Sequence, residues 1–167
     1  MSPDLVNFTI STNLNGAFFA VQAAAQQMAK QEPQGGSIIG ISSISALVGG
    51  GQQGHYTPTK AGVLSLMQSS AVALGKYGIR CNALLPGTIL TQLNERDLEA
   101  GGDKRKYMDG RCALGRVGVP EVSLSCVESE AVRVDVGANP NAFFSDVGHG
   151  RPGCISGLSG VERLRGQ

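Results

Sequence analysis

The chain has 167 residues, of which 41% are hydrophobic and 16% are charged, and its formal net charge is +1. This length allows one ordinary soluble domain, and the near-neutral balance argues against nucleic acid or an anionic membrane as an obligatory partner. No basic run precedes an apolar stretch at the N-terminus, and glutamines interrupt the most apolar early segment, so neither a signal peptide nor a membrane span is predicted.

The cysteines are scattered along the chain, with no C-x-x-C pair and no histidine at ligand spacing: Cys81, Cys112, Cys126 and Cys154. This pattern argues against a zinc site and against a disulfide scaffold, and it is typical of reduced thiols in the cytosol. We therefore expect a cytoplasmic protein without a bound metal.

Helical and strand patterns alternate in the first half of the chain. Ser2-Pro3-Asp4 predicts a helix start, and apolar residues at helical spacing then predict one buried face, made of Leu14, Phe18, Val21, Ala25 and Met28. A strand buried on both faces is predicted over residues 37–41, a second helix from Tyr56 to about Lys76, and a second buried strand over 79–85. This order, with short links, predicts an α/β fold with a parallel sheet.

The later part of the chain is less regular. Residues from Thr91 to about Leu114 are more polar and predict one or two short helices over a cleft. Within them, Lys104-Arg105-Lys106 is expected to be a solvated helix face. After Glu121 the apolar periodicity is lost and glycine is frequent, so we expect a disordered tail.

Tyr56 and Lys60 lie four residues apart at the start of a predicted helix, so they share one face about one turn apart. A tyrosine hydroxyl normally has a pKa near about 10 and is a poor base at neutral pH. A cationic neighbour favours the phenolate, so this spacing indicates a general acid or base.

Ser43 follows the first predicted strand at its carboxyl end, where open α/β sheets bind their ligands. It precedes Tyr56 across a glycine-rich loop that is able to fold back, so its hydroxyl can bond a substrate oxygen while Tyr56 moves the proton. Taken alone, Ser43 is an ordinary turn residue and Y-x-x-x-K is a common spacing. Their combination indicates a reaction centre.

Together with two outlying blocks, this stretch resembles the short-chain dehydrogenase/reductase family, whose signature is a serine followed by Tyr-x-x-x-Lys. Asn13 in T-N-L-N-G-A-F is similar to the family's helix asparagine, and I-R-C-N-A-L-L-P-G-T-I-L-T resembles the strand and loop that close over the nicotinamide. The blocks stand in the family's order between Asn13 and Pro120. The resemblance implies a partial doubly wound Rossmann-type parallel sheet, of which this chain carries the C-terminal half.

The resemblance also implies a role for each residue of the site. Tyr56 is the general acid/base, Lys60 favours its phenolate and holds the nicotinamide ribose, and Asn13 supports a water in a proton relay. The residues expected to face the substrate are Ser43, Ser45 and Tyr56. The residues expected to bind the cofactor are Tyr56, Lys60, Pro86, Gly87, Thr88 and Thr91.

The sequence around Tyr56 and Pro86 most resembles fungal and bacterial sugar dehydrogenases. This likeness implies hydride transfer between NAD or NADP and a secondary alcohol or carbonyl, with a sugar as the small-molecule substrate. The 3-oxoacyl reductase branch is a second candidate for the substrate, and the choice between NAD and NADP stays open. Because the family commonly oligomerises through the helices that bear Asn13 and Tyr56, a homodimer or homotetramer is expected of the parent enzyme.

Gly49 to Gly54 fits G-x-G-x-x-G literally, but a dinucleotide fingerprint belongs in the first strand-to-helix turn, with an acid about twenty residues further on. Here the run spans the loop between Ser43 and Tyr56, so we interpret it as active-site loop glycine. The family's first β-α-β half, with its pyrophosphate turn, is not found in the sequence. We therefore expect the chain alone not to bind the cofactor.

The chain is expected to divide after Glu121. Residues 1–121 form the catalytic half of the Rossmann domain and end in the family's G-R-x-G-x-P-E pattern. Residues 122–167 lose the pattern, and a back-translation fits a retained intron up to Val147 followed by a frameshifted exon. The genomic sequence tests this hypothesis, which implies a eukaryotic, fungal gene.

Three hypotheses for the function follow. The first is an NAD(P)-dependent oxidoreductase that acts on a sugar. The second is a catalytically inactive fragment, from a truncated gene model or isoform, that at most associates with full-length subunits. The third is an unrelated α/β binding domain. Cofactor binding separates the first two.

Overall fold

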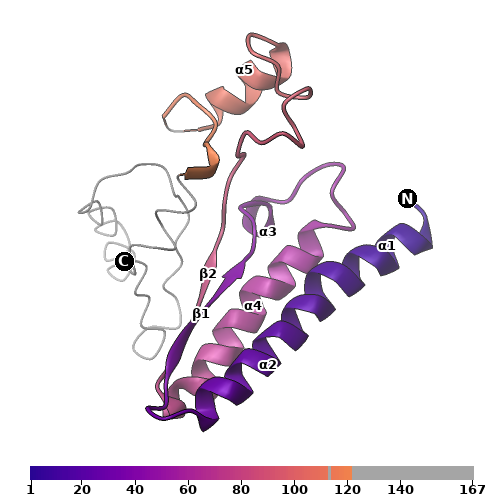
Figure 1. The fold of residues 1–167 in the computed structure, drawn as a ribbon. Coiled ribbons are helices and arrows are strands. Elements are labelled where there is room, and N and C mark those ends of the chain that lie inside the picture. Colours follow the sequence, from indigo (N-terminus) through magenta and orange to yellow (C-terminus); the bar gives the residue numbers. More distant parts are fainter. Residues whose placement is uncertain (113, 122–167) are drawn as a thin grey trace, which may run out of the picture.

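The structure is a computed structural model that describes residues 1–112 and 114–121 (Figure 1). The predicted tail, with the proposed intron and frameshifted exon, lies outside these residues. The elements in chain order are α1 (Pro3–Ile10), a π-helical turn η1 (Ser11–Asn15), α2 (Gly16–Lys30), β1 (Gly36–Ile41), α3 (Ser45–Val48), α4 (Thr57–Leu74), a 3₁₀ turn η2 (Gly75–Tyr77), β2 (Ile79–Leu84) and α5 (Asp103–Gly110).

Strands β1 and β2 pair in parallel, with a register that runs from Gly36 opposite Ile79 to Ile41 opposite Leu84. The predicted α/β fold with a partial parallel sheet is thereby confirmed. Helices α2 and α4 pack against one another and against the sheet (Figure 1). None of the helices among residues 1–112 and 114–121 is both long and apolar enough to span a membrane.

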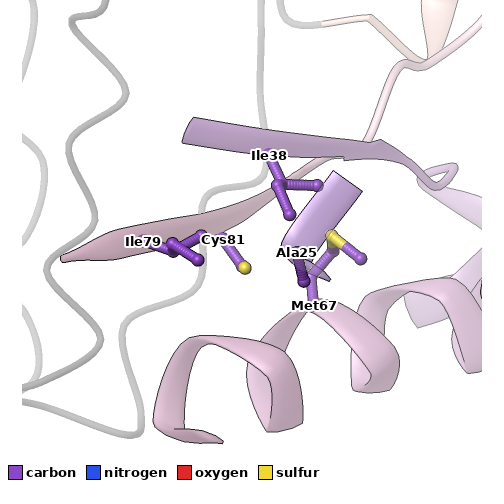
Figure 2. Close-up of a cluster of buried hydrophobic side chains, with 5 residues drawn as sticks. All are labelled: Ala25, Ile38, Met67, Ile79 and Cys81. Carbon is purple, nitrogen blue, oxygen red and sulfur yellow. The ribbon is translucent and has the colours of Figure 1, made fainter. Parts of the chain in front are cut away.

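The core lies between the sheet and these two helices. Its buried centre takes one residue from α2, one from α4 and three from the strands, which are Ala25, Met67, Ile38, Ile79 and Cys81 (Figure 2). Burial raises the pKa of the Cys81 thiol, so this cysteine stays protonated and acts as a small apolar side chain.

Two glycines of β1 let the helices lie close to the strand. A Cβ at Gly40 would lie 2.6 Å from Cγ of Met67, and a Cβ at Gly36 would lie 2.5 Å from Sδ of Met28. Real Cβ atoms essentially never come that close to another heavy atom. A side chain at either position would therefore displace Met67 or Met28 from its place against β1.

Two burial predictions were wrong. The side chain of Phe18 is 47% exposed, because the core reaches back along α2 only as far as Val21 and the Phe18 ring packs edge to face on Phe19, with centroids 5.9 Å apart. Ile41 is 48% exposed, so the last residue of β1 is not buried on both faces as the apolar run suggested. A run of apolar residues predicts a strand without specifying what covers its end.

Replacement of Met67 by alanine tests the packing of α4 on the sheet. Met67 is 1% exposed, so Met67→Ala should lower the free energy of unfolding by about 2–5 kcal/mol. Val72 on the same helix is 77% exposed, and Val72→Ala should change that free energy by less than about 0.5 kcal/mol. Urea unfolding followed by circular dichroism measures both, and equal losses for the two variants would contradict this packing.

Candidate active site

Tyr56 and Lys60 stand at the start of α4. Tyr56 is the N-cap residue of that helix, and a proline in the first turn helps to fix its direction. Nζ of Lys60 lies 5.6 Å from the centroid of the Tyr56 ring, so the two side chains share one face as their spacing predicted. Burial lowers the pKa of Lys60, because a partly desolvated ammonium is disfavoured.

Two hydrogen bonds join the end of β1 to the first turn of α4, and we call them the strand–helix junction. Nζ of Lys60 donates to the Ile41 carbonyl at 3.0 Å, and Oγ of Ser42 donates to the Lys60 carbonyl at 2.7 Å. Ser42 is 3% exposed, so its bond is sheltered from water. The junction holds Lys60 at the carboxyl end of the strand.

Ser43 begins the loop after β1, and Ser45 supplies its hydrogen-bond partners. The Ser45 N–H and O–H both donate to Oγ of Ser43, at 3.2 and 2.9 Å. A hydroxyl has two acceptor lone pairs and one donor proton, so the Ser43 proton stays available for another acceptor. Ser45 is 8% exposed, and its hydroxyl bonds Ser43.

Asn13 lies in the π-helical turn η1, which the sequence did not predict. Helices α1, η1 and α2 follow one another without a break, and π turns often mark functional positions in a helix. Nδ2 of Asn13 donates to Oγ1 of Thr59 at 3.2 Å. The Thr59 hydroxyl in turn donates to the Tyr56 carbonyl at 2.7 Å. Asn13 is thus brought to the same turn of α4 as Tyr56, through a threonine that the sequence analysis missed.

The segment after β2 meets this region at Pro86. The Ile44 N–H donates to the Pro86 carbonyl at 3.0 Å, so Pro86 lies beside the loop that carries Ser43. Thr88 and Thr91 are held by other parts of the chain: Oγ1 of Thr88 contacts Sδ of Met108 at 3.7 Å, and the Thr91 N–H donates to Oδ1 of Asn94 at 2.8 Å.

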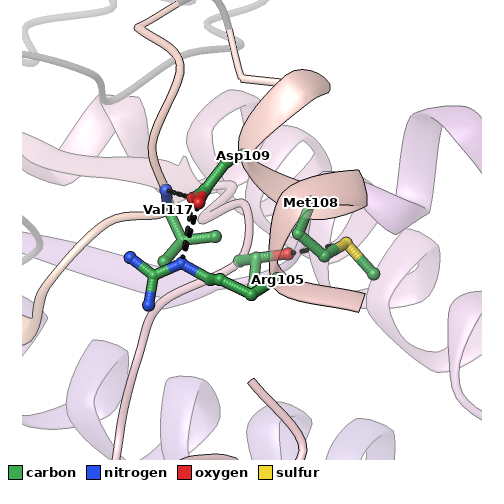
Figure 3. A network of polar contacts seen from close by, with 5 residues as sticks. Arg105, Met108, Asp109 and Val117 are labelled. Carbon is green, nitrogen blue, oxygen red and sulfur yellow. Dashed lines mark hydrogen bonds and ion pairs between the residues drawn. The ribbon is translucent and has the colours of Figure 1, made fainter. Parts of the chain in front are cut away.

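A carboxylate ties α5 to the segment at Val117 (Figure 3). Both oxygens of Asp109 lie 3.0 Å from Nε of Arg105, and Oδ1 also accepts the Val117 N–H at 2.7 Å. The segment beyond Val117 is bonded back to the chain after β2, because the Gly118 N–H donates to the Thr88 carbonyl at 3.0 Å. The prediction of a solvated Lys104-Arg105-Lys106 face was wrong for Arg105, whose side chain is 23% exposed and pairs with Asp109 one turn further along α5.

The glycine-rich run that resembles a dinucleotide fingerprint lies between α3 and α4. It does not follow a strand directly, and Gly49 adopts a left-handed conformation with φ near 70° as the C-cap of α3. The turn from β1 into α3 (42–44) contains no glycine. The glycine-rich run therefore lies in the loop before Tyr56.

The residues at this edge fit the nicotinamide half of a dinucleotide. A lysine ammonium has three donors, and the Ile41 carbonyl uses one of those of Lys60, so two are left for ribose hydroxyls. Gly87 is exposed, and a Cβ built there would meet none of the described residues within 4 Å.

Comparison with known proteins decides the family. A family model described as enoyl-(acyl carrier protein) reductase matches residues 1–127. This chain belongs to the short-chain dehydrogenase/reductase family. It is similar to the L-rhamnose-1-dehydrogenase of Scheffersomyces stipitis, with 71% identity over 121 residues, which are 72% of this chain and 46% of that protein.

A bacterial relative and a solved structure agree with this assignment. The L-rhamnose 1-dehydrogenase (NAD(P)(+)) of Sphingomonas sp. (strain SKA58) is 64% identical over 121 residues, 72% of this chain and 47% of that protein. The structure of ElxO with NADP bound superposes with a TM-score of 0.69 at 27% identity, over 76% of this chain and 50% of that one. The chain thus spans about half the length of the proteins it matches.

The Asp109 contact is expected to break in acid. Desolvation raises the pKa of Asp109, but the Val117 N–H and the Arg105 guanidinium together hold that pKa below its ordinary value. A lowered pKa means that the contact stabilises the folded chain at neutral pH and that this contribution is lost as the pH falls through the folded pKa. Hydrogen-exchange protection of the Val117 amide should therefore fall on acidification.

Two variants check the source of that pH dependence. Asp109→Asn should give low protection of Val117 at neutral and acid pH alike, since the charged acceptor is gone. Asp97→Asn is the matched control, because Asp97 is exposed and its ion pair within the described residues is with the exposed Lys104 of α5. Unchanged protection in Asp109→Asn would contradict the assignment.

Proposed function

We propose that this site is the reaction centre of an NAD(P)-dependent L-rhamnose 1-dehydrogenase. The observation that carries the chemistry is the strand–helix junction, which holds Lys60 beside Tyr56 at the carboxyl end of β1. The substrate is inferred from the names of the 71% and 64% identical relatives. An acyl substrate, which the description of the family model suggests, is the second candidate.

In the proposed reaction, the hydroxyl at C1 of the sugar binds between Ser43 and Tyr56. The Ser43 hydroxyl donates to the sugar oxygen, because its own acceptor positions are already occupied by Ser45. Tyr56 accepts the hydroxyl proton as the general base, with the Lys60 side chain beside its ring. The nicotinamide, when bound, supplies the acceptor for the hydride that leaves C1. The C1 carbon thereby becomes the carbonyl of a lactone.

The proposed roles of the other residues follow from the same arrangement. Lys60 uses its remaining donors to hold the nicotinamide ribose, and Asn13 supports a water through which the proton leaves Tyr56. The segment Pro86, Gly87, Thr88 and Thr91 covers the nicotinamide. The parent enzyme is proposed to be a cytoplasmic homo-oligomer, encoded by a fungal gene.

A hybrid protein tests the proposed function. The first half of the Scheffersomyces stipitis relative is joined ahead of this chain, and reduction of NAD or NADP is followed with L-rhamnose and, separately, reoxidation with a 3-oxoacyl thioester. We expect turnover with L-rhamnose. Tyr56→Phe in the hybrid should lower kcat by about 10²–10⁴-fold while cofactor binding stays within about twofold, since only the proton acceptor is lost.

Tyr77→Phe is the matched control in that assay, because Tyr77 lies in η2, beyond the C-terminal end of α4, and should leave kcat unchanged. Turnover only with the thioester would transfer the proposal to an acyl substrate. Full activity of the Tyr56→Phe hybrid would overturn the role of Tyr56.

The 167-residue chain alone is proposed to be catalytically idle. The family's pyrophosphate turn does not occur in this sequence, so most contacts that a dinucleotide needs would have to come from elsewhere. Titration of the purified chain with NADH and with NADPH, followed by cofactor fluorescence, should give no saturable signal in the micromolar range. Saturable micromolar binding would show that the chain forms a cofactor site by itself.

A further inference from the structure

We infer that Thr59 is a positioning residue of this site, and that its hydroxyl fixes Asn13 relative to Tyr56 and Lys60. The inference rests on the proposed function and adds to it a residue with no assigned role. Thr59 is 1% exposed, so its hydroxyl bonds are sheltered from water.

The two bonds of the Thr59 hydroxyl leave it little freedom. Its proton is donated to the Tyr56 carbonyl at 2.7 Å, which fixes the direction of the O–H. Its oxygen then accepts Nδ2 of Asn13 at 3.2 Å. Since one hydroxyl makes both bonds, a movement of the first turn of α4 displaces the Asn13 amide as well.

The donated bond also stabilises the start of α4. Tyr56 has no side-chain capping bond, and its carbonyl accepts both the Thr59 hydroxyl and the Lys60 N–H, the latter at 3.2 Å. The hydroxyl is therefore part of what keeps Tyr56 and Lys60 in register. Close packing supports the same contact from the next turn, because a Cβ at Gly62 would lie 2.8 Å from Cδ1 of Leu14, the neighbour of Asn13.

The accepted bond selects one orientation of Asn13. With Nδ2 donating to Thr59, the amide oxygen has no partner among the described residues and can accept from a water. The π turn around Asn13 departs from the α-helical i→i−4 pattern. The side-chain bond to Thr59 adds a contact with a second helix at this turn.

The first test observes Asn13 directly in the full 167-residue chain labelled with ¹⁵N-asparagine. The Asn13 side-chain amide is identified by its loss in Asn13→Asp, and its exchange with water is measured. Thr59→Val keeps the shape but removes the hydroxyl, so it should abolish the exchange protection of this amide. Thr59→Ser keeps the hydroxyl and should restore it.

Thr57→Val is the matched control, since it makes the same change in the same helical turn at a residue whose hydroxyl makes no bond within the described part of the chain. It should leave the Asn13 amide unchanged. The inference is overturned if Thr59→Val leaves Asn13 protected, or if Thr57→Val exposes it equally.

The second test measures kcat and KM in the hybrid protein. Thr59→Val should lower kcat about tenfold, the factor that corresponds to one ordinary hydrogen bond, with KM within about twofold and with recovery in Thr59→Ser. An unchanged kcat in an active Thr59→Val hybrid would overturn the inference. If the unsubstituted hybrid is inactive while the Asn13 amide responds as described, the positioning contact stands and the proposed function fails.

Discussion

Helix α4 is able to lie directly on strand β1 because Gly40 has no side chain to separate them. A Cβ at this glycine would come within 2.6 Å of Met67, the most deeply buried methionine of the core. With the helix packed this closely, Lys60 donates to the carbonyl of Ile41 and Ser42 donates to the carbonyl of Lys60. The packing of the core thus determines where the reactive end of α4 stands.

A second helix supports the same end of α4 from the other side. The π turn of η1 presents Asn13 to Thr59, and Thr59 returns a bond to Tyr56. The loop after β1 adds Ser43, whose acceptor positions are filled by Ser45, and it is bonded to Pro86 through Ile44. Each contact lies within the chain itself and has a backbone group or a hydroxyl as one of its partners.

Local patterns in the sequence were enough to predict both strands, the long helices and the nearness of Tyr56 to Lys60, because each depends on residues close along the chain. They missed the short helix α3, which lies in a stretch rich in serine and glycine. The contact of Asn13 with Thr59 joins residues 46 positions apart, and no local pattern encodes it. The residues of the π turn η1 do not differ in type from those of an ordinary α-helix, so the sequence did not predict it. The bond from Arg105 to Asp109 competes with hydration of a basic run, and Asp109 is also held by the Val117 N–H, eight residues further along the chain. The one feature of the sequence that pointed to Thr59 was its place three residues after Tyr56, inside the first turn of the helix.

Transfer of deuterium tests the central claim most directly, which is that the edge bearing Ser43, Tyr56 and Lys60 removes a hydride from a sugar carbon. The hybrid protein is supplied with L-rhamnose that carries deuterium at C1, and the reduced nicotinamide is analysed by mass spectrometry and NMR. The account predicts one deuterium per reduced nicotinamide, on a single face of the ring. Reduced cofactor without deuterium, or with deuterium on both faces, would contradict it.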